Sequence, residues 1–187
     1  MKNIIKTYDL PLLIVLTLLP VVSFTAIPVY VYYYGIVWQE PLLLIVGWFF
    51  SGTGITVGYH RLFSHKSFKA IPVIEWIYMI LGSMALQNTI INWCSDHRRH
   101  HRKLDTSEDP YSVKEGLLHA HIGWIVKKNN TNISGVSDLE KKSAIKFQNK
   151  FYWPIALFLS FVLPLLIGFI YNRPIGGLLW GGFLRIT

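Results

Sequence analysis

Two groups of histidines carry the chemistry that this sequence offers. The first is the pair His60 and His65, and the second is the cluster His97, His100 and His101. On a helix, residues at i, i+3 and i+4 share a face, so the three histidines of the second group can point the same way. His97 and His101 lie one turn apart, whereas His100 and His101 diverge by about 100°. Such a fan of imidazoles suits more than one metal ion, and imidazole binds zinc, copper, iron and nickel alike.

Both histidine groups stand where a long apolar stretch ends. Five histidines in this arrangement favour a metal site over isolated, solvated imidazoles. The carboxylates of Asp96 and Asp105 are candidates to accept a ring N–H and so fix the histidine tautomers, and either one equally fits a helix cap. His119 and His121 stand apart from both groups. We expect His119 to be solvated or hydrogen-bonded, and His121 to have a structural role.

The elements that must position these residues are membrane helices. The 187 residues are 52% apolar with a mean hydropathy of +0.37, and the apolar residues form long uncharged runs. This composition is typical of multi-pass membrane proteins. The net charge of +8 does not indicate a nucleic-acid partner, because the Lys and Arg flank apolar segments instead of forming one basic domain. The lone Cys94 excludes an intrachain disulfide framework and is expected to be a small buried residue.

Three segments are predicted to cross the bilayer. No charge occurs in residues 10–39, a run that exceeds the roughly 20 residues needed to cross and is too long for a signal peptide. Residues 41–59 form a second span of about 28 Å, and residues 151–170 form a third. A last apolar run, residues 174–184, is too short to cross. Because a helix should not end halfway through lipid, we expect the sequence to be a fragment.

The apolar run of residues 70–93 is not expected to cross. Glu75 interrupts its beginning, and Gln87, Asn88 and Asn92 interrupt its end. A single crossing would also put the two histidine groups on opposite sides of the membrane, where they could not share a site. Fourteen of the 18 Lys and Arg flank this run, which indicates that both of its ends face the cytoplasm. We therefore expect an all-α, multi-pass transmembrane protein with a cytoplasmic histidine cap and one non-spanning interfacial helix.

The histidine groups and their flanks resemble those of the membrane fatty acid desaturases, of the acyl-CoA (stearoyl-CoA Δ9) type. Gly-Tyr-His-Arg-Leu-Phe-Ser-His-Lys-Ser-Phe at 58–68 is similar to the first histidine box of that family. Trp93 and the following Asp-His-Arg-Arg-His-His at 96–101 are similar to the second box. Asp-Pro-Tyr at 109–111 and His-Ile-Gly-Trp at 121–124 match as well, so the resemblance covers nearly the whole chain.

By this resemblance, residues 1–187 form a single fatty acid desaturase domain that is incomplete at its C-terminus. The implied activity is insertion of a cis double bond into a saturated fatty acyl thioester, usually at carbon 9. Two iron ions would perform it with dioxygen and electrons from a separate donor of the cytochrome b5 or ferredoxin type, and the five grouped histidines are implied ligands. The family completes its site with an Asn-x3-His segment and a third His-x2-His-His box, which lie beyond this sequence. We therefore expect the 187-residue piece to be inactive alone.

The resemblance also assigns residues to the substrate. Gln87 and Asn88 stand where the family bends and contacts the acyl chain, and Trp93 stands where a residue lines its tunnel. Lys127 and Lys128 fall where the family places basic contacts to its acyl carrier, whose phosphates would attract them. From the residues alone, the two amides equally fit a polar helix end, and the two lysines equally fit a solvated pair near the membrane surface.

Other functions stay open on the sequence. The same boxes would suit a di-iron lipid hydroxylase or a desaturase of acyl chains already in phospholipid, and a metal-binding or transport protein is the non-enzymatic alternative. A transporter should hold ionisable residues within its spans, and the first two predicted spans hold none. The expected location is the bacterial inner membrane or the endoplasmic reticulum, with acyl-CoA, the bilayer and the electron donor as partners.

Overall fold

The computed structural model describes residues 7–127 and 133–187, and within them the chain folds into helices without a strand. Three of these helices are long and apolar enough to cross a membrane. They are Leu10–Tyr34 (α2), Gln39–Ser64, which joins α3 (Gln39–Thr53) to the π-helical η1 (Gly54–Ser64), and Ser143–Ile170, which joins α7 (Ser143–Leu157), η4 (Phe158–Val162) and α8 (Leu163–Ile170). The all-α class and the three predicted spans are confirmed.

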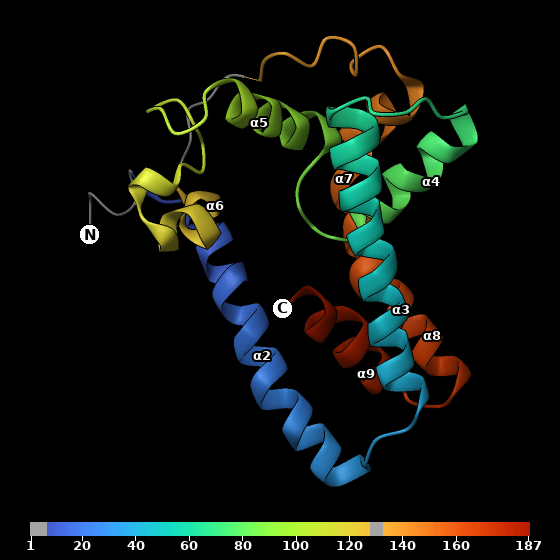
Figure 1. Ribbon diagram of the computed structural model, residues 1–187. Coiled ribbons are helices and arrows are strands. Elements are labelled where there is room, and N and C mark those ends of the chain that lie inside the picture. The colour runs from blue at the N-terminus through green and yellow to red at the C-terminus, as the bar shows by residue number, and fades with distance from the viewer. Residues whose placement is uncertain (1–6, 128–132) are drawn as a thin grey trace.

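The spans are packed together mainly through shorter helices. The α3–η1 span and the α7–α8 span both contact α4, which lies between η1 and α7, and α2 stands apart from them (Figure 1). The space between is bridged by the last apolar segment, Pro174–Gly177 (α9) and the π-helical Leu178–Leu184 (η5). Segment η5 contacts both α2 and α3, while α9 packs on α8. This segment lies among the spans without being long enough to be one.

The predicted non-spanning helix is Pro72–Ser83 (α4). It descends beside η1, and the chain then turns and returns as Ile90–Arg102 (α5), which lies across the end of the spans (Figure 1). Glycines allow the close approach of α4 to η1, since a Cβ on Gly54 would lie 2.3 Å from the backbone nitrogen of Gly82. Both histidine groups therefore emerge at the same end of the molecule.

The core lies where η1, α4, α5 and α7 meet. It includes Tyr59 and Phe63 of η1, Met79 of α4, Cys94 of α5 and Ile145 of α7, each 1% exposed or less. The predicted burial of the lone cysteine is thus confirmed. Three short elements, Val113–Glu115 (η2), His119–Gly123 (η3) and Trp124–Val126 (α6), follow α5, and α6 contacts the beginning of α2.

A buried carboxylate closes the opposite end of the spans. Glu40, at the start of α3, is fully buried and accepts a hydrogen bond of 2.6 Å from the hydroxyl of Tyr30 on α2. Arg173, between α8 and α9, lies 3.7 Å from the same carboxylate and donates to the carbonyls of Tyr34 and Gly35. The α2–α3 turn and the α8–α9 turn are therefore tied together.

Candidate metal centre

Four histidines from two segments converge on one point. His60 and His65 come from the end of η1, His97 and His101 come from one face of α5, and one ring nitrogen of each lies within 4.8 Å of the others. His97 is central, because its Nε2 is 3.0 Å from that of His65 and 3.1 Å from that of His101. Nitrogen ligands about 2.1 Å from a shared ion lie roughly 3 Å apart. The separations of His97 from His65 and from His101 therefore match those of ligands that share one transition-metal ion.

Burial and crowding favour the neutral form of His97 and His65. Desolvation, together with the neighbouring rings of His60, His101 and His65, lowers the pKa of His97 to about 3. Desolvation and the nearby histidines also lower the pKa of His65. Only the neutral ring offers a lone pair to a metal. At neutral pH His97 and His65 are thus held in their metal-binding form.

His100 is set apart from these four. Its ring centroid is 6.4 Å from that of His97, and its Nδ1 lies 2.8 Å from a carboxylate oxygen of Asp109, whose side chain is fully buried. Burial opposes ionisation of Asp109, yet hydrogen bonds from the backbone N–H of Asp105, from His100 and from the backbone N–H of Tyr111 hold its pKa below the usual range. An ionised carboxylate that accepts the Nδ1–H leaves Nε2 as the ligand atom of this ring.

The two carboxylates suggested by the sequence bond elsewhere. Asp96 pairs with Arg99 at 3.3 Å, and Asp105 accepts a hydrogen bond of 3.2 Å from the hydroxyl of Ser112. The carboxylate that orients a histidine is Asp109, in a segment that the sequence analysis noted only as part of the family match. Its carboxylate caps backbone N–H groups of that segment, and this local bonding turns it back toward α5.

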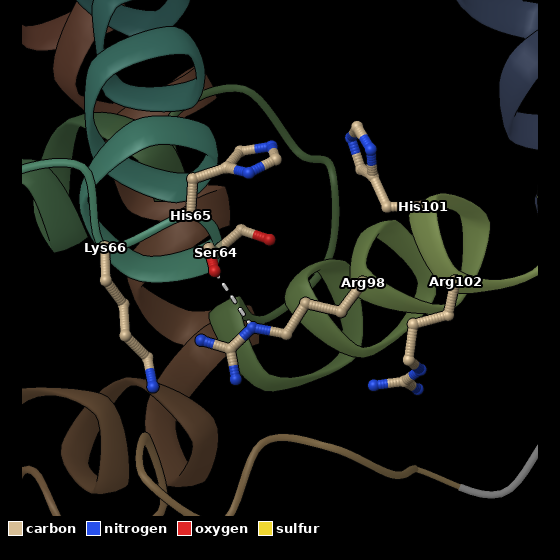
Figure 2. Close-up of a pocket in the computed structure, with 6 residues that line it drawn as sticks. All are labelled: Ser64, His65, Lys66, Arg98, His101 and Arg102. Atoms are coloured by element: carbon tan, nitrogen blue, oxygen red, sulfur yellow. Dashed lines mark hydrogen bonds between the residues drawn. The ribbon is translucent and has the colours of Figure 1, made fainter.

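Arg98 ties the two histidine segments together. Its guanidinium donates to the carbonyls of Phe63 and Ser64 at the end of η1, at 2.7 and 3.0 Å, the second of which is drawn in Figure 2. It also forms a two-pronged pair with the carboxylate of Asp138, at 2.7 and 3.2 Å. Burial opposes ionisation of that carboxylate, but Arg98 and Lys66 hold its pKa well below the usual range. The end of η1 and α5 are therefore held in a fixed relation.

An open basic pocket of about 390 Å³ borders the histidine group (Figure 2). His65 and His101 face each other across it, and Lys66, Arg98 and Arg102 supply its positive charge. Both histidine side chains are exposed there, whereas His60 and His97 are partly buried. The pocket therefore gives solvent access to the histidine group.

The predicted acyl-chain residues adjoin the metal group. The ring of Trp93 stacks on that of His97, with centroids 4.8 Å apart, and its Nε1 donates to the side-chain oxygen of Gln87 at 3.3 Å. Asn88 has left-handed backbone (φ 76°), and its N–H donates to the hydroxyl of Tyr152 at 2.8 Å. A strained turn, pinned from the third span, therefore presents two amides next to the histidines.

The predicted acyl-carrier lysines are only partly described. Lys127 donates to the carboxylate of Glu115 at 2.6 Å in a partly exposed pair, and Lys128 lies outside the described residues. His119 lies 3.6 Å from the same carboxylate with its side chain largely buried, whereas His121 is exposed.

The sequence profile of the family described as fatty acid desaturase matches residues 36–187, which include every histidine discussed above. The chain belongs to the fatty acid desaturase family. It is 38% identical over 150 residues to the probable acyl-CoA desaturase of Schizosaccharomyces pombe, covering 78% of this chain and 31% of that protein. It is 38% identical over 136 residues to the Delta(9)-fatty-acid desaturase fat-6 of Caenorhabditis elegans, covering 70% and 40%. It is 36% identical over 126 residues to the stearoyl-CoA desaturase of Homo sapiens, covering 64% and 35%.

These comparisons confirm the resemblance drawn from the two histidine boxes. The chain spans between 31% and 40% of the length of the three relatives. Membership in a membrane-bound family, together with helices long enough to cross, makes it an integral membrane protein, as its composition predicted.

Proposed function

We propose that this chain carries the first two histidine groups of a membrane acyl-CoA desaturase, which inserts a cis double bond at Δ9 of a saturated acyl chain at a di-iron centre. The observation that carries the proposal is the convergence of four imidazoles from two segments beside a polar turn. Removing two hydrogens from CH2–CH2 while reducing dioxygen to two waters takes two further electrons and two protons. A separate donor protein of the cytochrome b5 or ferredoxin type would supply the electrons.

Iron bound here would supply the oxidation of an unactivated C–H bond, a chemistry that belongs to the metal and not to side chains. The four convergent histidines would hold one ion. His100, oriented by Asp109, would offer Nε2 to a second ion, whose remaining ligands lie outside the five grouped histidines. The distance between His100 and the central His97 supports this division of ligands between two ions.

The remaining residues would place the substrate. An alkyl chain has no polar handle, so the carbon that reacts is set by shape, and Trp93 offers a rigid wall directly against His97. Gln87, held by Trp93, and Asn88 would mark the bend of the acyl chain. Lys127 could bind a phosphate of the acyl carrier by exchanging its exposed pair with Glu115, because such surface pairs are worth only about 0–1 kcal/mol.

Metal titration tests the centre itself. The detergent-purified chain is titrated anaerobically with Fe(II) or Co(II), and we expect the four-histidine group to bind one ion. His97→Ala should weaken binding by at least about tenfold, since even residues behind metal ligands cost 10–100-fold. His121→Ala is the matched control, because His121 is exposed and outside the group. An unchanged metal affinity in His97→Ala would refute the proposed centre.

Product analysis tests the reaction. A complete desaturase containing this segment, given stearoyl-CoA, dioxygen and an electron donor, should release a Δ9 cis-monoene. A hydroxylated product would identify a hydroxylase instead, and a double bond found only in phospholipid would identify a lipid desaturase. The 187-residue chain alone should not turn over, since its five grouped histidines are too few for two irons. Turnover by this chain would contradict that count.

A further inference from the structure

An apolar groove of about 470 Å³ lies between α4 and the third span. Its walls include three α4 residues and three from α7–η4: Trp76, Met79, Ile80, Phe147, Pro154 and Phe158. The groove lies where α7 is distorted, since Phe151 has non-helical backbone and Pro154 has no N–H to bond the preceding turn. Every side chain lining it is apolar.

Two exposed lysines of α7 stand next to the groove. Lys146 and Lys150 are separated by one helical turn, and between them lies Phe147, which lines the groove and packs its ring 5.2 Å from that of Trp76. Because α7 begins a candidate span, these lysines stand at the level of lipid headgroups, while Pro154 and Phe158 lie deeper.

The two lysines differ from the neighbouring Lys142 in their ion pairing. Lys142, one turn before Lys146, pairs with Glu75 of α4. Among the carboxylates that the structure describes, none pairs with Lys146 or Lys150. The ammonium of Lys150 instead lies 5.1 Å from the centre of the Phe151 ring. Two cations are therefore available to an anion from outside the chain.

We propose that this groove and its lysines bind one anionic phospholipid of the surrounding bilayer. An acyl chain occupies the groove, and the phosphate headgroup pairs with Lys146 and Lys150. A zwitterionic lipid could fill the same groove, but it brings no net negative charge to the lysines, so the lysines make the site selective. The groove is separate from the histidine group, and the proposal does not depend on the desaturase reaction.

The dependence of lipid retention on headgroup charge tests the contact between the headgroup and the lysines. The chain is purified from nanodiscs of equal parts phosphatidylglycerol and phosphatidylcholine with identical acyl chains, and retained lipid is counted by native mass spectrometry. Each lysine should favour phosphatidylglycerol about fivefold, which corresponds to about 1 kcal/mol per basic residue. Lys146→Gln and Lys150→Gln should each lower the preference by that factor, while Lys114→Gln, at an exposed lysine outside the groove, leaves it unchanged. No preference, or one that survives both substitutions, overturns the proposal.

Filling the groove with a larger side chain tests whether the acyl chain binds there. Ile80→Trp should displace the retained phosphatidylglycerol because the added ring fills the groove. Ile77→Trp is the matched control, since Ile77 is 43% and Ile80 40% exposed on the same helix, but only Ile80 lines the groove. Circular dichroism confirms that both variants fold. The proposal of a bound lipid is overturned if Ile80→Trp leaves the retention of phosphatidylglycerol unchanged. It is also overturned if glycerol phosphate, which has no acyl chains, displaces the bound lipid as well as phosphatidylglycerol does.

Discussion

His97 concentrates the electrostatics of the metal centre in one side chain. Its Nε2 lies within hydrogen-bonding distance of two other imidazoles, and charging it would place a proton among crowded, partly desolvated rings. An ordinary histidine, with a pKa near 6.5, would hold a proton in competition with a metal at mildly acidic pH. His97 instead keeps the lone pair of its ring nitrogen free of a proton, so it can bind a metal ion even at mildly acidic pH.

The metal-free chain should lose stability as the pH falls from about 6.5 to about 3. Unfolded His97 binds a proton below about pH 6.5, whereas folded His97 binds one only below about 3. The unfolded state therefore binds more protons across this window, and stability rises with pH within it. His65, whose pKa is also lowered, acts in the same direction. Thermal unfolding in detergent, followed by circular dichroism from pH 4 to 8, measures the slope.

His97→Gln should flatten that slope, and His121→Gln should not. Asp138 should contribute little to the slope above pH 4. Its pKa is lowered from 3.8, so its stabilising effect disappears mainly as the pH falls below that value. An unchanged slope in His97→Gln would show that other groups cause the acid sensitivity.

At the scale of elements, the site depends on how η1 and α5 are joined. The ligands of η1 and α5 are more than thirty residues apart in sequence, and metal affinity depends on their being held close. Arg98 supplies a rigid link, because a planar guanidinium can donate to two carbonyls and a carboxylate at once. The link lies beside the imidazoles and uses none of them.

Asp138→Ala should loosen that link. It leaves Arg98, whose side chain is 14% exposed, without its carboxylate, and bonds to charged groups are worth about 1.5–3 kcal/mol. We expect about 2 kcal/mol less free energy of unfolding and a weaker affinity for Co(II). Lys66→Ala removes the other partner of Asp138, which is 58% exposed, and should cost less than about 1 kcal/mol. Equal losses in the two variants would mean that Arg98 is not the essential partner.

Gly54→Ala should push α4 away from η1. The new Cβ would lie 2.3 Å from backbone of α4, which cannot rotate aside, and overpacking of this kind costs about 1–3 kcal/mol. Gly52→Ala is the control, because its Cβ would meet open space and alanine is favoured in helices by about 0.5–1 kcal/mol. The two variants should therefore shift the melting temperature in opposite directions. A stabilised Gly54→Ala would contradict the close packing of the two helices.

The sequence predicted a helix and its course where a single feature determines them, either a regular pattern of residues or one requirement that two distant segments meet. Uninterrupted hydropathy is enough to locate spans, and the need for two histidine groups to meet is enough to turn α4 back. Helical spacing brings His97 and His101 together, but it cannot say which carboxylate returns to His100, because that depends on how the turn around Asp109 folds. The role of Arg98 was hidden for another reason: its acceptors include backbone carbonyls, which leave no trace in the sequence.

The whole molecule has two unlike ends. One end carries the histidine groups and most of the basic residues, while the other is closed by the buried Glu40 with Arg173. Lys and Arg near membrane spans are retained on the cytoplasmic side during insertion. The charge distribution therefore predicts that the metal centre faces the cytoplasm and that the α2–α3 turn faces the opposite side.

Cysteine labelling tests this orientation with little background. The native Cys94 is fully buried, and burial raises the pKa of its thiol to about 12, so it should not react with maleimide. In spheroplasts of a bacterial host, a membrane-impermeant maleimide should label Ile36→Cys, an exposed site in the α2–α3 turn. Lys114→Cys, exposed near the histidine end, should be labelled only after the membrane is opened. The reverse labelling pattern would mean that the protein has the opposite orientation in the membrane. Labelling of both sites from outside would mean that α2 and α3 do not place the two ends on opposite sides of the bilayer. A cytoplasmic electron donor would then not be on the same side as the histidines by virtue of this topology.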